Sequence, residues 1–145
     1  MVLSARAKPA PKIPSRVKVS ITLVKYTTPN LSKIEKAKNY GFVPPPSTKK
    51  GTIIGIIKIG RGKNNDLVLD HPTVSRAHGY ILLTSTTNEI QIFYQDSSEN
   101  GTTVNKKLIT KKIVPLTPES VLKIGFLDDN KTPAFSLLFK YELQD

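Results

Sequence analysis

The sequence predicts an all-β protein, a β-sandwich of about ten or eleven short strands. In several short runs, apolar and polar residues alternate with a period of two, which is the pattern of a half-buried strand. Clusters of Gly, Pro, Asn, Asp and Ser separate these runs, and no long stretch has the 3.6-residue period of a helix. Many short strands joined by such turns are typical of a sandwich.

Residues 1–16 are a basic, proline-rich segment before the first strand. The segment has no acidic residue, and its cations and prolines are Arg6, Lys8, Lys12, Arg16, Pro9, Pro11 and Pro14. This composition predicts a mobile N-terminal arm. Residues 17–145 are expected to form a single domain, because 145 residues are enough for one core but few for two.

The first strand of this domain is predicted over residues 17–26. Val17, Val19, Ile21 and Leu23 lie at every second position and alternate with Lys or polar side chains. This period of two predicts one buried and one exposed face.

Residues 27–51 break the strand pattern and are interpreted as an insertion in the domain. A short helix is expected over residues 32–40, with Ser32 as its N-cap and Glu35 as the reciprocal capping partner. Loops of this length tend to be functional or disordered. The insertion is therefore either a second contact surface or tolerated extra chain.

The remaining strands are expected between residues 52 and 143. The isoleucine-rich run 52–59 has a bulge signal at Gly55. The runs 78–84 and 88–94 flank a polar turn and predict a hairpin. Further strands are expected at residues 67–69, 103–104, 108–109, 121–127 and 134–143.

The composition excludes several classes of protein. Cysteine is absent, which removes disulfides and cysteine chemistry, and the two histidines, His71 and His78, are poorly spaced for a metal site. We therefore expect no metal and no cofactor. No apolar run approaches the roughly 20 residues of a membrane helix, so a soluble intracellular protein is expected.

The charge favours an acidic partner. Lys and Arg outnumber Asp and Glu by 22 to 11, which gives a formal net charge of +11. Such an excess attracts phosphopeptides and nucleic acids alike. A basic nucleic-acid-binding β domain that uses residues 1–16 and 27–51 is therefore the alternative function, although no zinc-finger spacing or base-stacking motif accompanies it.

Three polar motifs follow the predicted strands and could aim several donors at one ligand. They are Gly60-Arg61, Ser75-Arg76-Ala77-His78, and Asn100-Gly101-Thr102 with Asn105 shortly after it. A guanidinium fork, a hydroxyl, a second cation and an amide together suit a tetrahedral dianion.

The order and spacing of these motifs resemble the forkhead-associated (FHA) family of phosphothreonine-binding modules. The resemblance covers roughly residues 52–143 and implies a sandwich whose binding loops gather at one end. It also implies that Arg61 and Ser75 contact the phosphate and that Arg76 adds a phosphate or backbone contact. Asn100 would hold the main chain of the bound peptide.

The same resemblance implies a supporting set around the binding loops. Its members are Gly60, His78, Gly101, Thr102 and Asn105. Three positions depart from the usual pattern of the family, namely Glu99, Lys106 and Ser120. Glu99 bears on peptide selectivity, and the other two bear mainly on turn stability.

The function implied by the resemblance is docking of a threonine-phosphorylated partner in nuclear signalling, such as the DNA-damage response or cell-cycle control. Catalysis is not expected, because Ser75 and His78 are three residues apart at a strand start and no Gly-x-Ser-x-Gly elbow surrounds the serine. No glycine-rich nucleotide loop is present either.

Overall fold

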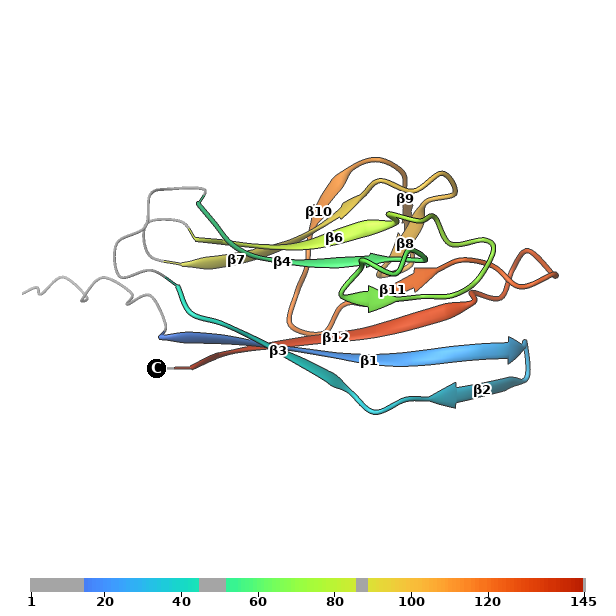
Figure 1. Cartoon of the computed structure of the whole chain (residues 1–145), viewed down its shortest axis with the longest axis horizontal. Coiled ribbons are helices and arrows are strands. Elements are labelled where there is room, and N and C mark those ends of the chain that lie inside the picture. The colour runs from blue at the N-terminus through green and yellow to red at the C-terminus, as the bar shows by residue number, and fades with distance from the viewer. Residues whose placement is uncertain (1–14, 45–51, 86–88, 145) are drawn as a thin grey trace, which may run out of the picture.

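The computed structural model describes residues 15–44, 52–85 and 89–144. Within these residues the chain forms twelve strands and no helix, which confirms the predicted all-β sandwich. None of the described segments is a helix that could cross a membrane. The strands, drawn in Figure 1, are β1 (Arg16–Thr28), β2 (Leu31–Ile34), β3 (Lys38–Phe42), β4 (Thr52–Gly60), β5 (Leu67–Val68), β6 (Gly79–Ser85), β7 (Ile90–Asp96), β8 (Thr102–Val104), β9 (Lys107–Ile109), β10 (Ile113–Pro115), β11 (Val121–Ile124) and β12 (Phe135–Gln144).

Two sheets form the layers of the sandwich. The larger sheet has the order β2-β1-β12-β11-β8-β9, and β3 also pairs with β1. The smaller sheet has the order β10-β7-β6-β4-β5. The first and last long strands, β1 and β12, pair antiparallel from Arg16↔Gln144 to Lys25↔Phe135, so both ends of the described chain are fixed in one sheet.

The smaller sheet confirms two local predictions. β6 and β7 form the predicted antiparallel hairpin, paired from Gly79↔Asp96 to Ser85↔Ile90. The register of β4 against β6 shifts between Ile53 and Gly55, at the predicted bulge.

The core lies between the two sheets and follows the alternation of the sequence. Val17, Val19 and Ile21 of β1 are buried, while the intervening Lys18 is exposed. The smaller sheet contributes its own inward positions, among them Ile57, Ile59, Ile81, Leu83, Ile92 and Tyr94. These apolar side chains meet those of β11 and β12 in a single cluster.

The short helix predicted over residues 32–40 is wrong. This segment contains β2 and the start of β3, which pair antiparallel with β1 at positions such as Val24↔Ile34 and Val17↔Phe42. Tyr40 and Phe42 also pack against the core, so tertiary pairing overrides the local helix signal. The last residues of the interpreted insertion, 45–51, lie outside the described residues, as do residues 1–14 of the predicted arm.

The loops that carry the polar motifs gather at one end of the sandwich. Figure 1 places the β4–β5 and β5–β6 connections beside the β7–β8 and β11–β12 connections, at the end opposite the C-terminus. The predicted clustering of these loops at one end is therefore confirmed.

Candidate functional site

The site begins where β4 ends and two loops lie together. The main-chain N–H of Arg61 donates to the carbonyl of Ser75 at 3.0 Å, and that of Gly62 donates to the carbonyl of Arg76 at 3.1 Å. These two bonds form a short ladder between segments that are 14 residues apart in the chain. The ladder fixes three of the predicted ligand residues relative to one another.

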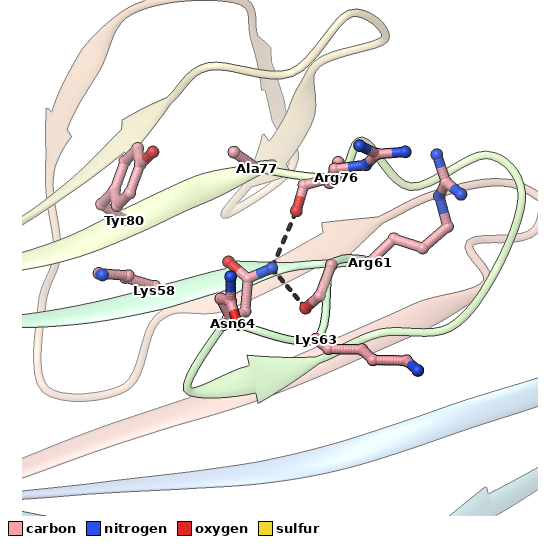
Figure 2. Close-up of a pocket in the computed structure, with 9 residues that line it drawn as sticks. Lys58, Arg61, Lys63, Asn64, Arg76, Ala77 and Tyr80 are labelled. Carbon is pink, nitrogen blue, oxygen red and sulfur yellow. Dashed lines mark hydrogen bonds between the residues drawn. The ribbon is translucent and has the colours of Figure 1, made fainter.

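The Arg61 side chain is oriented by its own loop. Its Nε donates to the carbonyl oxygen of Val74 at 3.0 Å, while the residue as a whole remains exposed. Because Nε is used, the two terminal nitrogens of the guanidinium fork remain to face a ligand. Figure 2 shows the guanidinium groups of Arg61 and Arg76 close together at the rim of one pocket.

Asn65 is a support that the sequence analysis missed, because it was interpreted only as a turn residue. Its Nδ2 donates to the carbonyls of Gly62 and Arg76, both at 2.8 Å. The bridge closes the ladder from the other side. Gly60 leaves the space for it, since a Cβ there would collide with the Arg76 carbonyl oxygen.

Ser75 connects this ladder to the loop that carries Asn100. The half-buried Ser75 hydroxyl oxygen accepts the main-chain N–H of Glu99 at 3.1 Å, which leaves its own hydrogen to donate outward. Asn100 follows directly and is exposed. The structure thus brings Arg61, Ser75, Arg76 and Asn100 to one end of the sandwich.

His78 lies beneath this cluster and is fully buried. Its Nδ1 accepts the main-chain N–H of Ser75 at 3.1 Å, so Nε2 carries the ring hydrogen and faces the Gly101 carbonyl at 3.2 Å and Thr102 Oγ1 at 3.1 Å. Burial lowers the pKa of His78 despite opposing effects of Asp96 and Gly101, which keeps the imidazole neutral. Because the ring meets the backbone of Ser75, the serine hydroxyl is not paired with a base.

Thr102 joins the histidine to a buried polar network. Its hydroxyl lies 2.8 Å from Asp96 Oδ1 and 2.8 Å from the Tyr94 hydroxyl, in addition to His78. Burial raises the pKa of Tyr94 strongly, so its phenol keeps its hydrogen. The network therefore links the Ser75 loop to β7 and β8 entirely through buried groups.

Asp96 is a second support that the sequence analysis missed. Its carboxylate accepts the Ser98 hydroxyl at 2.8 and 3.0 Å and the Lys111 main-chain N–H at 2.9 Å. Ser98 Oγ in turn accepts the Gly101 N–H at 2.8 Å, which shapes the turn that presents Asn100. The sequence did contain a signal for Asp96. It lies two residues after Tyr94, at the next inward-facing position of β7, and an acidic side chain at such a position needs buried partners.

Gly101 has no room for a side chain in this turn. Its φ of +85° is in the left-handed region, and a Cβ would lie 2.8 Å from the carbonyl oxygen of Ile109. The turn that presents Asn100 therefore requires glycine.

A third loop joins the cluster through Thr73. Its hydroxyl donates to the Phe126 carbonyl at 3.2 Å and accepts the Phe126 N–H at 2.8 Å. The loop before Ser75 is thereby tied to the β11–β12 connection. Asp129 organises the tip of that connection, and its bonds to Thr132 and Lys131 lower the pKa of the Asp129 carboxyl.

Asn105 lies at the opposite end of β8 from Thr102. It occupies the β8–β9 turn with φ +47°, accepts the Val121 N–H at 2.8 Å and donates to Ser120 Oγ at 3.1 Å. Ser120 is buried and also accepts the Thr117 N–H at 2.9 Å. Asn105 therefore braces β8 against β11 and does not touch the cluster around Ser75.

The pocket beside the cluster is open and cationic. It has a volume of about 490 Å³, and its described lining includes no acidic residue. The lining residues are Lys58, Arg61, Gly62, Lys63, Asn64, Asn65, Arg76, Ala77 and Tyr80. In the described part of the chain, no group of three His, Asp or Glu side chains could hold a metal ion.

The comparisons with known proteins agree on one type of domain. A sequence model of the FHA domain matches residues 57–125. An engineered FHA domain studied with a Myc-pTBD peptide aligns with a TM-score of 0.64 and 20% identity, over 88% of this chain and 93% of that one. Full-length yeast Pml1p aligns with a TM-score of 0.61 and 16% identity, over 97% of this chain and 87% of that one.

The N-terminal FHA domain of Rad53p from S. cerevisiae, in complex with a phosphothreonine peptide, gives a TM-score of 0.57 and 18% identity, over 84% of this chain and 93% of that one. A search of curated protein sequences found no match. At these identities the structural likenesses establish the fold, and the sequence match falls on the segment that carries β4 to β11. The chain therefore has the fold of forkhead-associated (FHA) domains, and its residues 57–125 match the sequence model of that family.

Proposed function

We propose that this chain is a phosphothreonine-dependent interaction module that docks a phosphorylated protein. One observation carries the proposal: the free fork of Arg61, the donating hydroxyl of Ser75 and the side chains of Arg76 and Asn100 gather on loops fixed to one another. A preorganised set of charged and neutral donors suits a phosphate dianion. The Rad53p domain with the same fold was solved with such a peptide, which supports this ligand class.

Each side chain has a distinct role in the proposed complex. Arg61 binds two phosphate oxygens with its terminal nitrogens, and Ser75 donates its hydroxyl hydrogen to the same group. Arg76 adds a second cation. Asn100 bonds the peptide main chain beside the phosphothreonine, because an amide can both donate and accept.

The expected energies indicate that the phosphate alone is not sufficient for tight binding. Three hydrogen bonds to a charged group contribute about 5 to 9 kcal/mol together, before the costs of association and of ordering the peptide. A micromolar complex needs about 8 kcal/mol. Peptide residues that flank the phosphothreonine therefore contribute contacts to the neighbouring loops.

The test is a titration of a degenerate phosphothreonine peptide library and its unphosphorylated twin into the wild-type chain. We expect binding of the phosphorylated library only, and a loss of at least about tenfold in Arg61→Ala. Lys18→Ala is the matched control, because it removes one exposed cation from the other sheet. Equal binding of the twins, or equal losses in the two variants, would overturn the proposal.

We further propose that the phosphorylated partner acts in nuclear signalling, within processes such as the DNA-damage response or cell-cycle control. Yeast Pml1, a splicing factor of the same fold, supports a nuclear setting, and the formal charge of +11 suits acidic partners. Imaging of the tagged chain checks the location. A DNA shift assay at two salt concentrations checks the alternative, since nucleic-acid binding loses affinity steeply as salt rises.

A further inference from the structure

The outer face of the smaller sheet carries a row of apolar side chains. The row consists of direct cross-strand partners on β4, β6, β7 and β10, and its members are Ile56, Leu82, Phe93 and Pro115. Neighbouring positions on these strands, such as Ile57, Ile81 and Ile92, are buried in the core. Because side chains alternate along a strand, the row faces away from the core.

Two isoleucines extend this row into a diagonal band, which we call the apolar band. Ile113 pairs with Gln95 at the β10 end of the row. Ile53 pairs with Thr84 at the β4 end, on the other side of the row. Ile53, Ile56 and Ile113 are 53%, 45% and 57% exposed. Strands lie about 4.8 Å apart and successive outward residues about 6.8 Å apart, so the band is roughly 20 Å long.

The outer face of the larger sheet has a different composition. β1 projects Lys18, Ser20 and Thr22 outward between its buried residues, and Lys140 of β12 pairs with Ser20. A sheet face in contact with water normally carries such polar side chains. A contiguous apolar patch with a polar rim is typical of an interaction surface. The apolar band therefore indicates a face that becomes covered in a complex.

A helix is the element that suits this face. The inner strands β4, β6 and β7 pair with a neighbour on both sides, so the backbone of the sheet is occupied by its own ladders. An element that lies on the face must satisfy its own N–H and C=O groups, and a helix does so internally. The band of roughly 20 Å matches a helix of about 13 residues.

The charges around the band favour an acidic helix. The outward side chains of the described strands β4, β6, β7 and β10 include no acid, and Lys58 projects among them. Lys111 and Lys112 precede β10 and are exposed. Asp66 accepts the Lys58 N–H at the edge of β4, and Glu89 lies at the other end of the sheet, before β7. Two copies of this chain, each with a formal net charge of +11, repel one another, which disfavours a second copy as the occupant.

We propose that the apolar band docks an amphipathic helix of an acidic partner protein, independently of phosphorylation. The apolar stripe of the helix packs on Leu82 and Phe93 at the centre of the band. Its flanking carboxylates face Lys58 on one side and the lysines before β10 on the other. This surface is separate from the loops that carry Arg61 and Ser75, so the inference does not rest on the proposed function.

The test uses synthetic, unphosphorylated helical peptides of about 14 residues, with leucine and phenylalanine along one face and either glutamate or lysine on both flanks. A scrambled glutamate peptide of the same composition is the control. In an NMR titration of the ¹⁵N-labelled chain, we expect the shift changes to fall on β4, β6, β7 and β10. The glutamate peptide should bind at least about fivefold more tightly than the lysine peptide or the scrambled one. Absence of binding, shift changes on the larger sheet instead, or equal affinities for the three peptides would overturn the inference.

Variants assign the binding to the apolar band. Ile113→Glu should weaken binding of the glutamate peptide at least about tenfold, and Ile56→Glu is a second variant in case the first does not fold. Ile34→Glu is the matched control, because Ile34 is an exposed isoleucine on β2 of the larger sheet. Equal losses in the band variant and in Ile34→Glu would overturn the inference. Sedimentation of the wild type tests the other occupant: a dimer that Ile113→Glu dissociates would show that a second copy covers the band, and would also overturn the inference.

Discussion

Thr102→Val tests the buried network that supports the candidate site. Valine has nearly the shape of threonine and keeps the β-branch that suits β8. The substitution removes one hydroxyl, which lies 2.8 Å from Asp96 Oδ1, 2.8 Å from the Tyr94 hydroxyl and 3.1 Å from His78 Nε2. The change is therefore almost purely a loss of hydrogen bonds.

The expected loss of stability in Thr102→Val depends on which hydrogen bonds each partner of the Thr102 hydroxyl retains. Asp96 retains its bonds from Ser98 and the Lys111 N–H, and His78 retains the Gly101 carbonyl. Tyr94 loses its 2.8 Å bond in the core and keeps its interaction with Asp96, and the net loss of one such hydrogen bond costs about 0.5 to 1.5 kcal/mol. With the weakened bonds of the other two partners, we expect a loss of about 2 to 3 kcal/mol in the free energy of unfolding.

The assay is urea unfolding followed by circular dichroism, with Thr103→Val as the control. Thr103 is the next residue of β8 and is only partly buried, so its substitution should change stability by less than about 0.5 kcal/mol. Thr102→Val should lower the unfolding midpoint and leave the denaturant slope unchanged. If the two variants unfold at the same concentration, the network does not stabilise the fold and the reasoning is refuted.

Three further predictions concern backbone space, a turn and pH. Gly60→Ala should destabilise the fold by more than about 2 kcal/mol in the same assay, because its Cβ would meet the Arg76 carbonyl oxygen; Gly41→Ala, with nothing within 4 Å, should be near neutral or slightly stabilising. Lys106→Gly should stabilise the fold by roughly 0.5 to 1 kcal/mol, because Lys106 has a φ of +75°. The adjacent Lys107→Gly should destabilise the fold by about as much, because Lys107 lies in β9. If both substitutions shifted the unfolding midpoint in the same direction, the argument from the turn would be contradicted. Because burial lowers the pKa of His78 in the folded state, the unfolded chain binds its proton first, so the unfolding midpoint should fall as pH drops from 7 through about 6.5; a flat profile down to pH 5.5 would contradict a buried neutral ring.

The strands that sequence reasoning found are those with one clearly apolar face. In β1, Val17, Val19 and Ile21 are buried as their alternation predicts, and β7 buries Ile90 and Ile92 in the same way. β2, β3 and β10 were not predicted, because their pattern is weak: every residue of β2 is exposed. Such edge strands form mainly through backbone hydrogen bonds to a neighbouring strand. Backbone pairing leaves no clear pattern of side chains, so it is difficult to predict from a single sequence.

The failed helix has the same origin. Ser32 and Glu35 have the spacing of a capping box, and the lysines between residues 33 and 38 tolerate a helix. The long β1 strand offers its unpaired edge to this segment, and pairing with it satisfies several backbone groups at once. Packing of Tyr40 and Phe42 against the core adds apolar burial that an isolated short helix lacks.

In the candidate site, too, some residues could be recognised from the sequence and others only from the structure. The residues proposed to face a ligand, such as Arg61 and Asn100, have distinctive side chains at strand ends, so their identity and order in the sequence point to them. Supports such as Asn65 and Asp96 act on main-chain groups of other loops, including the Arg76 carbonyl and the Lys111 N–H. Those contacts depend on which loops become neighbours in the fold, so only the structure reveals them. It follows that a variant of Asn65 should disturb ligand binding through the Arg76 loop, although its side chain touches no proposed ligand.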